Sequence, residues 1–111
     1  MDPDSDYRLV FCTCPGEDTG LRLATQVVEQ RLAACVSLIP GLTSIYRWEG
    51  SVQQDREVLL LIKTRGERLA DLTETLRRLH PYEVPEIIAV QIAAGLPDYL
   101  SWLTQCTQPH T

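Results

Sequence analysis

Three short runs of this sequence are apolar at both odd and even positions. They are residues 9–12, 58–62 and 87–92, and each is rich in residues that favour β-strands. Successive side chains of a strand point to opposite faces of its sheet, so these strands would be apolar on both faces. A sheet with one face in water alternates apolar and polar residues instead. The chain must therefore form a sheet that is covered on both sides.

A first helix is expected after the Pro15-Gly16 break, ending at Ala33-Ala34. Asp18 or Thr19 is available as its N-cap, with Glu17 near the positive helix end. Its predicted apolar stripe, at spacings of 3, 4 and 4, consists of Leu21, Ala24, Val28 and Leu32. One face of the sheet would be covered in part by this stripe.

A second helix is predicted to open at Gly66 and to carry a leucine stripe. It must end near His80, because Pro81 lacks an N–H and drives the residue before it out of the α region. Pro85 stiffens the connector that follows, and a strand runs from Ile87 to Ile92. The stripe, at spacings of 3, 4 and 3, is formed by Leu69, Leu72, Leu76 and Leu79.

Residues 36–64 are predicted to form two strands joined by a tight turn. The first strand covers residues 36–39, bends or bulges at Pro40-Gly41 and resumes over residues 43–48. After the turn at residues 49–51, the chain returns over residues 52–64. The hairpin is longer than ordinary strands of about 5–6 residues. Its unpaired backbone groups are free to pair with another chain.

The expected order is strand, helix, strand, strand, helix, strand and a C-terminal helix from Pro97. This is a split βαβ or ferredoxin-like α+β fold. The last helix should present Tyr99, Leu100, Trp102 and Leu103 on its apolar side. Three helices cannot cover both faces of the sheet, so the sequence predicts an oligomer. We expect one domain over residues 7–106, after an acidic leader of residues 1–6 and before a tail of residues 107–111, with a radius of gyration of about 13 Å.

Charge and composition exclude several function classes. The net charge is −5 and there is no cluster of Lys and Arg, which argues against nucleic acid and anionic membranes as partners. No apolar run approaches the roughly 20 residues of a membrane span, so a cytoplasmic protein is expected, with its four cysteines as thiols. Pro15 and Glu17 also make residues 14–17 a poor phosphate-binding loop. We therefore do not expect a phosphate-cleaving enzyme.

Four blocks of the sequence carry a resemblance. LAACVSLIPGLTSIYRWEG, EVLLLIKT, LHPYEVPEIIAVQI and YLSW follow one another between Leu9 and Leu103. In this order the blocks resemble the CutA divalent-cation-tolerance family. The resemblance implies a ferredoxin-like fold, a homotrimer, and a non-catalytic role in tolerance or homeostasis of divalent metals, copper first among them. The metal would not be needed for folding.

The resemblance also implies metal ligands. A cysteine on the first strand corresponds to Cys12, and a histidine before Pro-Tyr corresponds to His80. Cys14 lies two residues from Cys12, on the same face of a strand, and two sulfurs so placed suit a soft ion such as Cu(I). The alternatives are buried apolar thiols for both cysteines and a helix C-cap for His80.

The same fold and trimer resemble the PII signalling proteins, which bind small ligands in clefts between subunits. Lys63 would serve an anionic ligand there, or would pair with Glu57, Glu83 or Glu86. Large rings on one strand face would otherwise pack at an interface between subunits. Cys35 is expected to be a packed core thiol. The predicted cleft residues are Tyr46, Trp48, Glu57, Lys63, Tyr82 and Glu86.

Overall fold

The computed structural model describes residues 6–109, so the predicted leader, apart from Asp6, and the last two residues of the predicted tail lie outside the described residues. The predicted order of helices and strands is confirmed. The elements are β1 (Tyr7–Cys14), α1 (Glu17–Glu29), β2 (Cys35–Trp48), β3 (Ser51–Arg65), α2 (Gly66–Leu79), β4 (Ile87–Gln91) and α3 (Pro97–Cys106).

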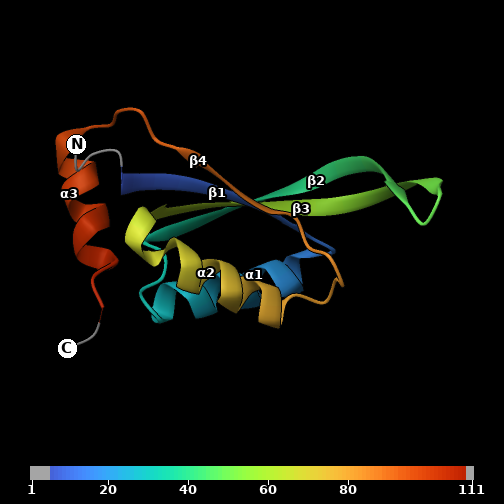
Figure 1. Ribbon diagram of the computed structural model, residues 1–111, viewed down its shortest axis with the longest axis horizontal. Helices are drawn as coiled ribbons and strands as arrows, with labels where there is room; N and C mark the ends of the chain where they lie inside the picture. Colours follow the sequence, from blue (N-terminus) through green and yellow to red (C-terminus); the bar gives the residue numbers. More distant parts are fainter. Residues whose placement is uncertain (1–5, 110–111) are drawn as a thin grey trace.

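The four strands form one antiparallel sheet in the order β2-β3-β1-β4. Helices α1 and α2 lie side by side against one face of it, and α3 stands at the end of the sheet away from the hairpin (Figure 1). The register of β2 and β3 shifts between Ile39 and Leu42, at the predicted Pro40-Gly41 break. The architecture is thus a mixed α+β fold with helices on one face.

The β2–β3 hairpin extends far beyond the rest of the sheet. Its turn has φ values of 50° at Glu49 and 85° at Gly50, and Trp48 pairs with Ser51 across it. Positive φ at both central residues gives the turn that matches the twist of a hairpin. The last residue of β1, Cys14, pairs with Val58. The earlier part of β3 pairs with β2 only, and the molecule measures 44 × 27 × 22 Å with a radius of gyration of 14.7 Å.

The core lies between the sheet and the two crossover helices. From α2 it receives the predicted leucine stripe: Leu72 and Leu76 are fully buried, and Leu69 and Leu79 pack against the cluster. The helix ends where Pro81 requires, with His80 as its C-cap. The sheet contributes the fully buried side chains of Val10, Cys12, Cys14, Leu60 and Ile62. The predicted second helix is confirmed in position and in phase.

The predicted apolar stripe of α1 is wrong in part, because Ala24 is buried as predicted but two other members of the stripe are exposed. Leu21 and Val28 are 55% and 40% exposed, and the helix ends at Glu29, short of the predicted Ala33-Ala34. Its buried residues are Gly20, Leu23, Ala24 and Val27. A Cβ on Gly20 would lie 3.1 Å from Leu38 Cδ2, so the helix lies close to the sheet at this glycine. This close contact turns the helix away from the predicted stripe.

Both ends of α1 also differ from the prediction. The N-cap is Gly16, whose lack of a side chain leaves no side-chain cap bond, and Asp18 lies inside the first turn. At the other end, Arg31 adopts a φ of 62°, which ends the helix before Leu32. Leu32 is nevertheless buried, because its backbone N–H bonds to Val27 O and holds the departing chain against the core.

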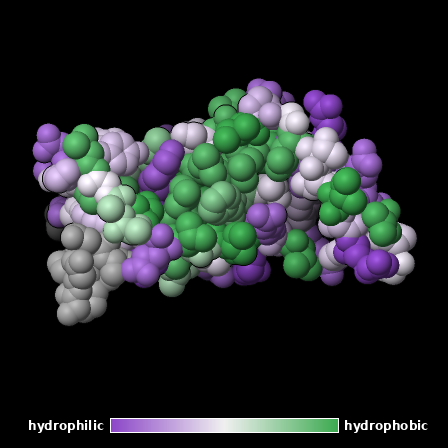
Figure 2. Space-filling view, turned by 90° about the horizontal axis from the view of Figure 1, so that it is seen from above, coloured by the Kyte–Doolittle hydropathy of each residue, from purple (hydrophilic) through white to green (hydrophobic). Residues whose placement is uncertain are grey.

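The second face of the sheet has no covering helix in residues 6–109. Seen from this side, it presents a continuous apolar patch between α3 and the hairpin (Figure 2). Ile88 and Val90 on β4 are 55% and 47% exposed. We call this surface the open face. Directly paired residues share a face of a sheet, so the register places on it Leu9, Phe11, Leu59, Leu61, Ile88 and Val90.

Helix α3 packs by one side only. Leu103 is fully buried, whereas Tyr99 and Trp102 are 41% and 42% exposed, so the predicted four-residue apolar side is wrong in part. The helix meets the end of the sheet rather than its face, and the two exposed rings contact each other with centroids 5.3 Å apart. Thr107, in the predicted tail, is fully buried and accepts a bond from Arg65 Nε at 2.8 Å.

Candidate functional site

A cleft of about 650 Å³ lies where the hairpin leaves the sheet. One wall comes from β2 and β3, and the other from the connector between α2 and β4. The structure brings five of the six predicted cleft residues together here: Tyr46, Trp48, Glu57, Tyr82 and Glu86. The remaining lining residues are Thr13, Ser44, Ile45, Pro81, Glu83 and Val84.

Hydrogen bonds to carboxylates hold two aromatic side chains of the cleft in place. Tyr82 donates its hydroxyl to Glu57 Oε2 at 2.7 Å, and Tyr46 donates its hydroxyl to Asp55. Burial and the bond to Glu57 raise the pKa of Tyr82 well above its usual range. The bond to Asp55 raises the pKa of Tyr46. Both phenols are therefore neutral at physiological pH, and neither offsets the negative charge beside it.

His80 connects the end of α2 to the cleft. Its side chain is 7% exposed, and its Nε2 lies 2.8 Å from Thr13 O, a carbonyl on β1. The backbone N–H of Tyr82 donates to its Nδ1 at 3.1 Å. An Nδ1 that accepts leaves the proton on Nε2, so the ring is neutral and both nitrogens are engaged. The imidazole thus fixes Tyr82 at the cleft.

Cys12 and Cys14 share the helix-covered face of β1, where both are fully buried. Burial raises the pKa of the Cys12 thiol to about 12. The pKa of Cys14 is also raised by burial. A metal binds the thiolate form, which these surroundings disfavour. The two cysteines are side by side as predicted, but in the form of apolar core thiols.

These donors do not fit a ready metal centre. Ligation by His80 would break a bond to Thr13 or Tyr82, and ligation by Cys12 would require a deprotonated sulfur in the core. Within residues 6–109, no three side chains of His, Cys, Asp or Glu come together in an arrangement that could hold an ion. In the single chain, Cys12 and Cys14 therefore act as core residues, and His80 holds the connector to β1.

Lys63 lies apart from the cleft. Its Nζ donates to Ser37 Oγ at 3.0 Å and lies 3.9 Å from Cys35 Sγ, so its partner is a hydroxyl rather than one of the predicted glutamates. Cys35 is half-buried beside this lysine, not packed in the core as expected. Both side chains are on the open face, since Cys35 and Lys63 are direct partners in the sheet.

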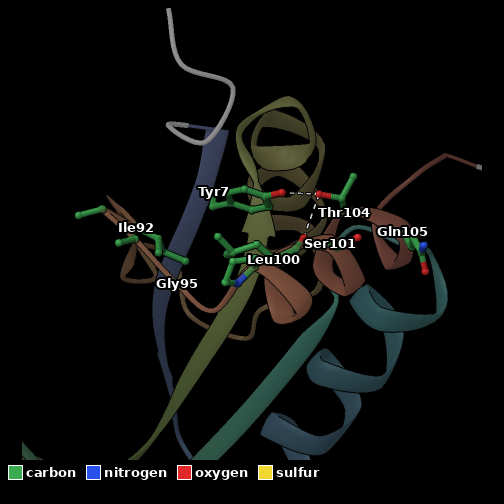
Figure 3. A pocket seen from close by; sticks show the side chains of 10 residues that line it. Tyr7, Ile92, Gly95, Leu100, Ser101, Thr104 and Gln105 are labelled. Atoms are coloured by element: carbon green, nitrogen blue, oxygen red, sulfur yellow. Dashed lines mark hydrogen bonds between the residues drawn. The ribbon is translucent and has the colours of Figure 1, made fainter.

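A second cavity, of about 520 Å³, lies between the start of β1, the end of β4 and α3 (Figure 3). Tyr7 and Thr104, 97 residues apart, meet there with their oxygens 2.5 Å apart. No pattern in the sequence pairs these two residues, because only the packing of α3 brings them together. The lining holds no charged side chain among the described residues, so we regard it as a packing site.

With this geometry established, comparison with known proteins identifies the family. Residues 8–106 match the sequence profile of the CutA1 divalent ion tolerance protein family. The chain belongs to this family. None of the helices within residues 6–109 is long and apolar enough to cross a membrane.

Individual relatives agree with this assignment. Divalent-cation tolerance protein CutA of Thermus thermophilus is 50% identical over 99 residues, which cover 89% of this chain and 96% of that protein. Protein CutA of the mouse is 51% identical over 98 residues, 88% of this chain but only 55% of the mouse protein. The crystal structure of CutA1 from Oryza sativa has a TM-score of 0.91 at 44% identity, covering 96% of this chain and 98% of that one.

Proposed function

We propose that this protein is a homotrimer with a non-catalytic role in divalent-cation tolerance, built on a single ferredoxin-like domain of residues 7–106. Family membership supports the role, and the open face supports the assembly. The strand order β2-β3-β1-β4 with two crossover helices on one face supports the ferredoxin-like assignment.

The open face is the single observation that carries the assembly. Ile88 and Val90 are about half exposed there in one chain, and Leu9, Phe11, Leu59 and Leu61 are partly exposed. An uncovered apolar surface of this extent is a liability for a monomer. The hairpin adds free backbone groups beyond the end of β1 that a neighbouring chain can pair with. A head-to-tail contact made in this way must close into a ring to avoid a filament.

Copper is the ion that we propose, with Cys12 and His80 as ligands and Cys14 as a possible third. Thiolate and imidazole donors suit soft and borderline ions. The engaged nitrogens of His80 and the buried thiols make binding weak, because the folded chain must rearrange to release them. The four thiols are unpaired in the described residues and suit a reducing compartment, so we propose the cytoplasm.

Copper titration of the purified protein tests the metal role. If Cys12 and His80 share an ion, Cys12→Ser and His80→Asn should each weaken copper binding at least about tenfold, because mutation of a residue that only supports a ligand already costs about this much. Cys106→Ser, a half-buried thiol on α3, is the matched control and should bind as the wild type does. Unchanged copper binding in both variants would mean that His80 is not a copper ligand and has only a structural role at the end of α2.

The second candidate function rests on the cleft. A pocket of about 650 Å³ with three aromatic side chains has the size and lining of a small-molecule site. In a trimer, such a site would serve as a PII-like sensor or adaptor whose ligand or protein partner binds between subunits. In one chain the described lining of the cleft has three carboxylates and no basic residue, so ATP would need basic residues of a neighbouring subunit to bind there. Titration with ATP against titration with copper separates the two functions.

A further inference from the structure

We propose that the cleft between the hairpin and the α2–β4 connector binds a small organic cation, such as a quaternary ammonium or a polyamine. The observations are a buried carboxylate that forms no ion pair within residues 6–109, aromatic walls, and negative charge on the remaining wall. This inference goes beyond a role in metal tolerance, and it needs neither the copper site nor the trimer.

The buried carboxylate is that of Glu57. It is 7% exposed and accepts one hydrogen bond, from the neutral phenol of Tyr82 at 2.7 Å. The ion pairs formed within residues 6–109 join Arg65 to Glu67 and Arg77 to Glu74, so neither contains Glu57. A buried charge is costly unless an opposite charge pairs with it. Glu57 therefore favours a cation in the space that it lines.

The walls of the cleft suit an organic cation. Tyr46, Trp48 and Tyr82 all line it, and the faces of aromatic rings attract ammonium groups within about 6 Å. The hydroxyls of both tyrosines are already bonded to carboxylates, which fixes the rings before any ligand arrives. Preorganised walls lower the entropic cost of binding.

The charge of the cleft disfavours the other ligand classes. Glu57, Glu83 and Glu86 line it, and no basic residue does so in the described part of the chain. An anionic metabolite such as a nucleotide would be repelled. A bare metal ion requires its oxygen donors to converge, and no three acidic side chains of residues 6–109 do. Carboxylates spread around aromatic rings fit a bulky cation better than either.

Tryptophan fluorescence provides the test. In Trp102→Phe protein, Trp48 is the one remaining tryptophan and lies in the cleft. Tetramethylammonium or spermidine should change its emission in a saturable way, whereas ATP and magnesium chloride should not. Glu57→Gln should weaken binding of the cation at least tenfold. Glu57 is buried, so its substitution could also disturb folding, and a second variant is needed. Glu86 is exposed, and Glu86→Gln should weaken binding of the cation about threefold without a folding cost.

Matched controls make the outcome decisive. Glu29→Gln removes one exposed carboxylate on α1, outside the cleft, and should leave the titration unchanged. Equal weakening by Glu29→Gln would mean unspecific charge attraction and would overturn the proposal. So would tighter binding of ATP, or no response to either cation. Light scattering on the same sample reports the assembly separately, so a failed trimer and a failed ligand site are distinguished.

Discussion

The two faces of the sheet have similar composition but different surroundings. On the helix-covered face, Val10, Leu60 and Ile62 are fully buried by α1 and α2. On the open face, Ile88, the neighbour of the half-buried Ile87, is 55% exposed. The first face is covered within this chain, and the second is the face that we propose other chains cover. Substitutions on the covered face should therefore affect folding, and substitutions on the open face should affect assembly.

The largest effect is expected from a substitution on the covered side. Leu72 is fully buried on α2, so Leu72→Ala removes apolar contacts and leaves a cavity. We expect a loss of about 2–5 kcal/mol in the free energy of unfolding, measured by denaturant melts. A loss below about 1 kcal/mol would contradict the packing of α2 on the sheet.

The covered face should also make stability fall at alkaline pH. Burial raises the pKa of Cys12 from 9.0 to about 12, so above pH 9 the unfolded chain loses this proton before the folded chain does. The unfolding free energy should then decrease by up to about 1.4 kcal/mol per pH unit from this group, between pH 9 and 12. Denaturant melts of Cys12→Ala should show a shallower decline than the wild type. An equal decline would show that Cys12 ionises freely in the folded protein.

A smaller effect separates two neighbouring residues of α1. Val27 is fully buried and Val28 is 40% exposed. Val27→Ala should cost about 2 kcal/mol, from two buried carbon groups and the space they leave, and Val28→Ala less than about 0.5 kcal/mol. Chemical denaturation of both variants measures the difference. The reverse order would restore the stripe of Leu21 and Val28 that the sequence favoured.

The contrast between α1 and α2 shows what the sequence could predict of the fold. Helix α2 has leucines at regular spacing and a proline that fixes its end, so both its phase and its boundary could be predicted. Helix α1 lies close to the sheet at Gly20, a residue that adds nothing to an apolar pattern. Leu23, Ala24 and Val27 also recur at helical spacing, so packing against the sheet decides between their stripe and the predicted one.

The cleft shows how far the sequence could predict the residues of the candidate site. Glu57 and Lys63 were predicted to line one cleft, and both lie on β3, at positions that share a face of the strand. Six residues of strand nevertheless separate them by about 20 Å, at roughly 3.3 Å per residue. The lysine ends beside Ser37 at the α3 end of the sheet. Spacing along a strand predicts which face a residue lies on, but two residues of one face line the same cleft only if they are also close along the strand.

The mass of the protein in solution tests most directly the claim that the open face belongs to other chains. Light scattering at micromolar concentration should give three times the chain mass of 12.5 kDa. Ile88→Asp places a charge on the open face and should lower that mass while the chain stays folded, because Ile88 contributes little to the core. A wild-type mass near 12.5 kDa would contradict the account. A dimer would still allow a second chain to cover the open face but would exclude the three-membered ring.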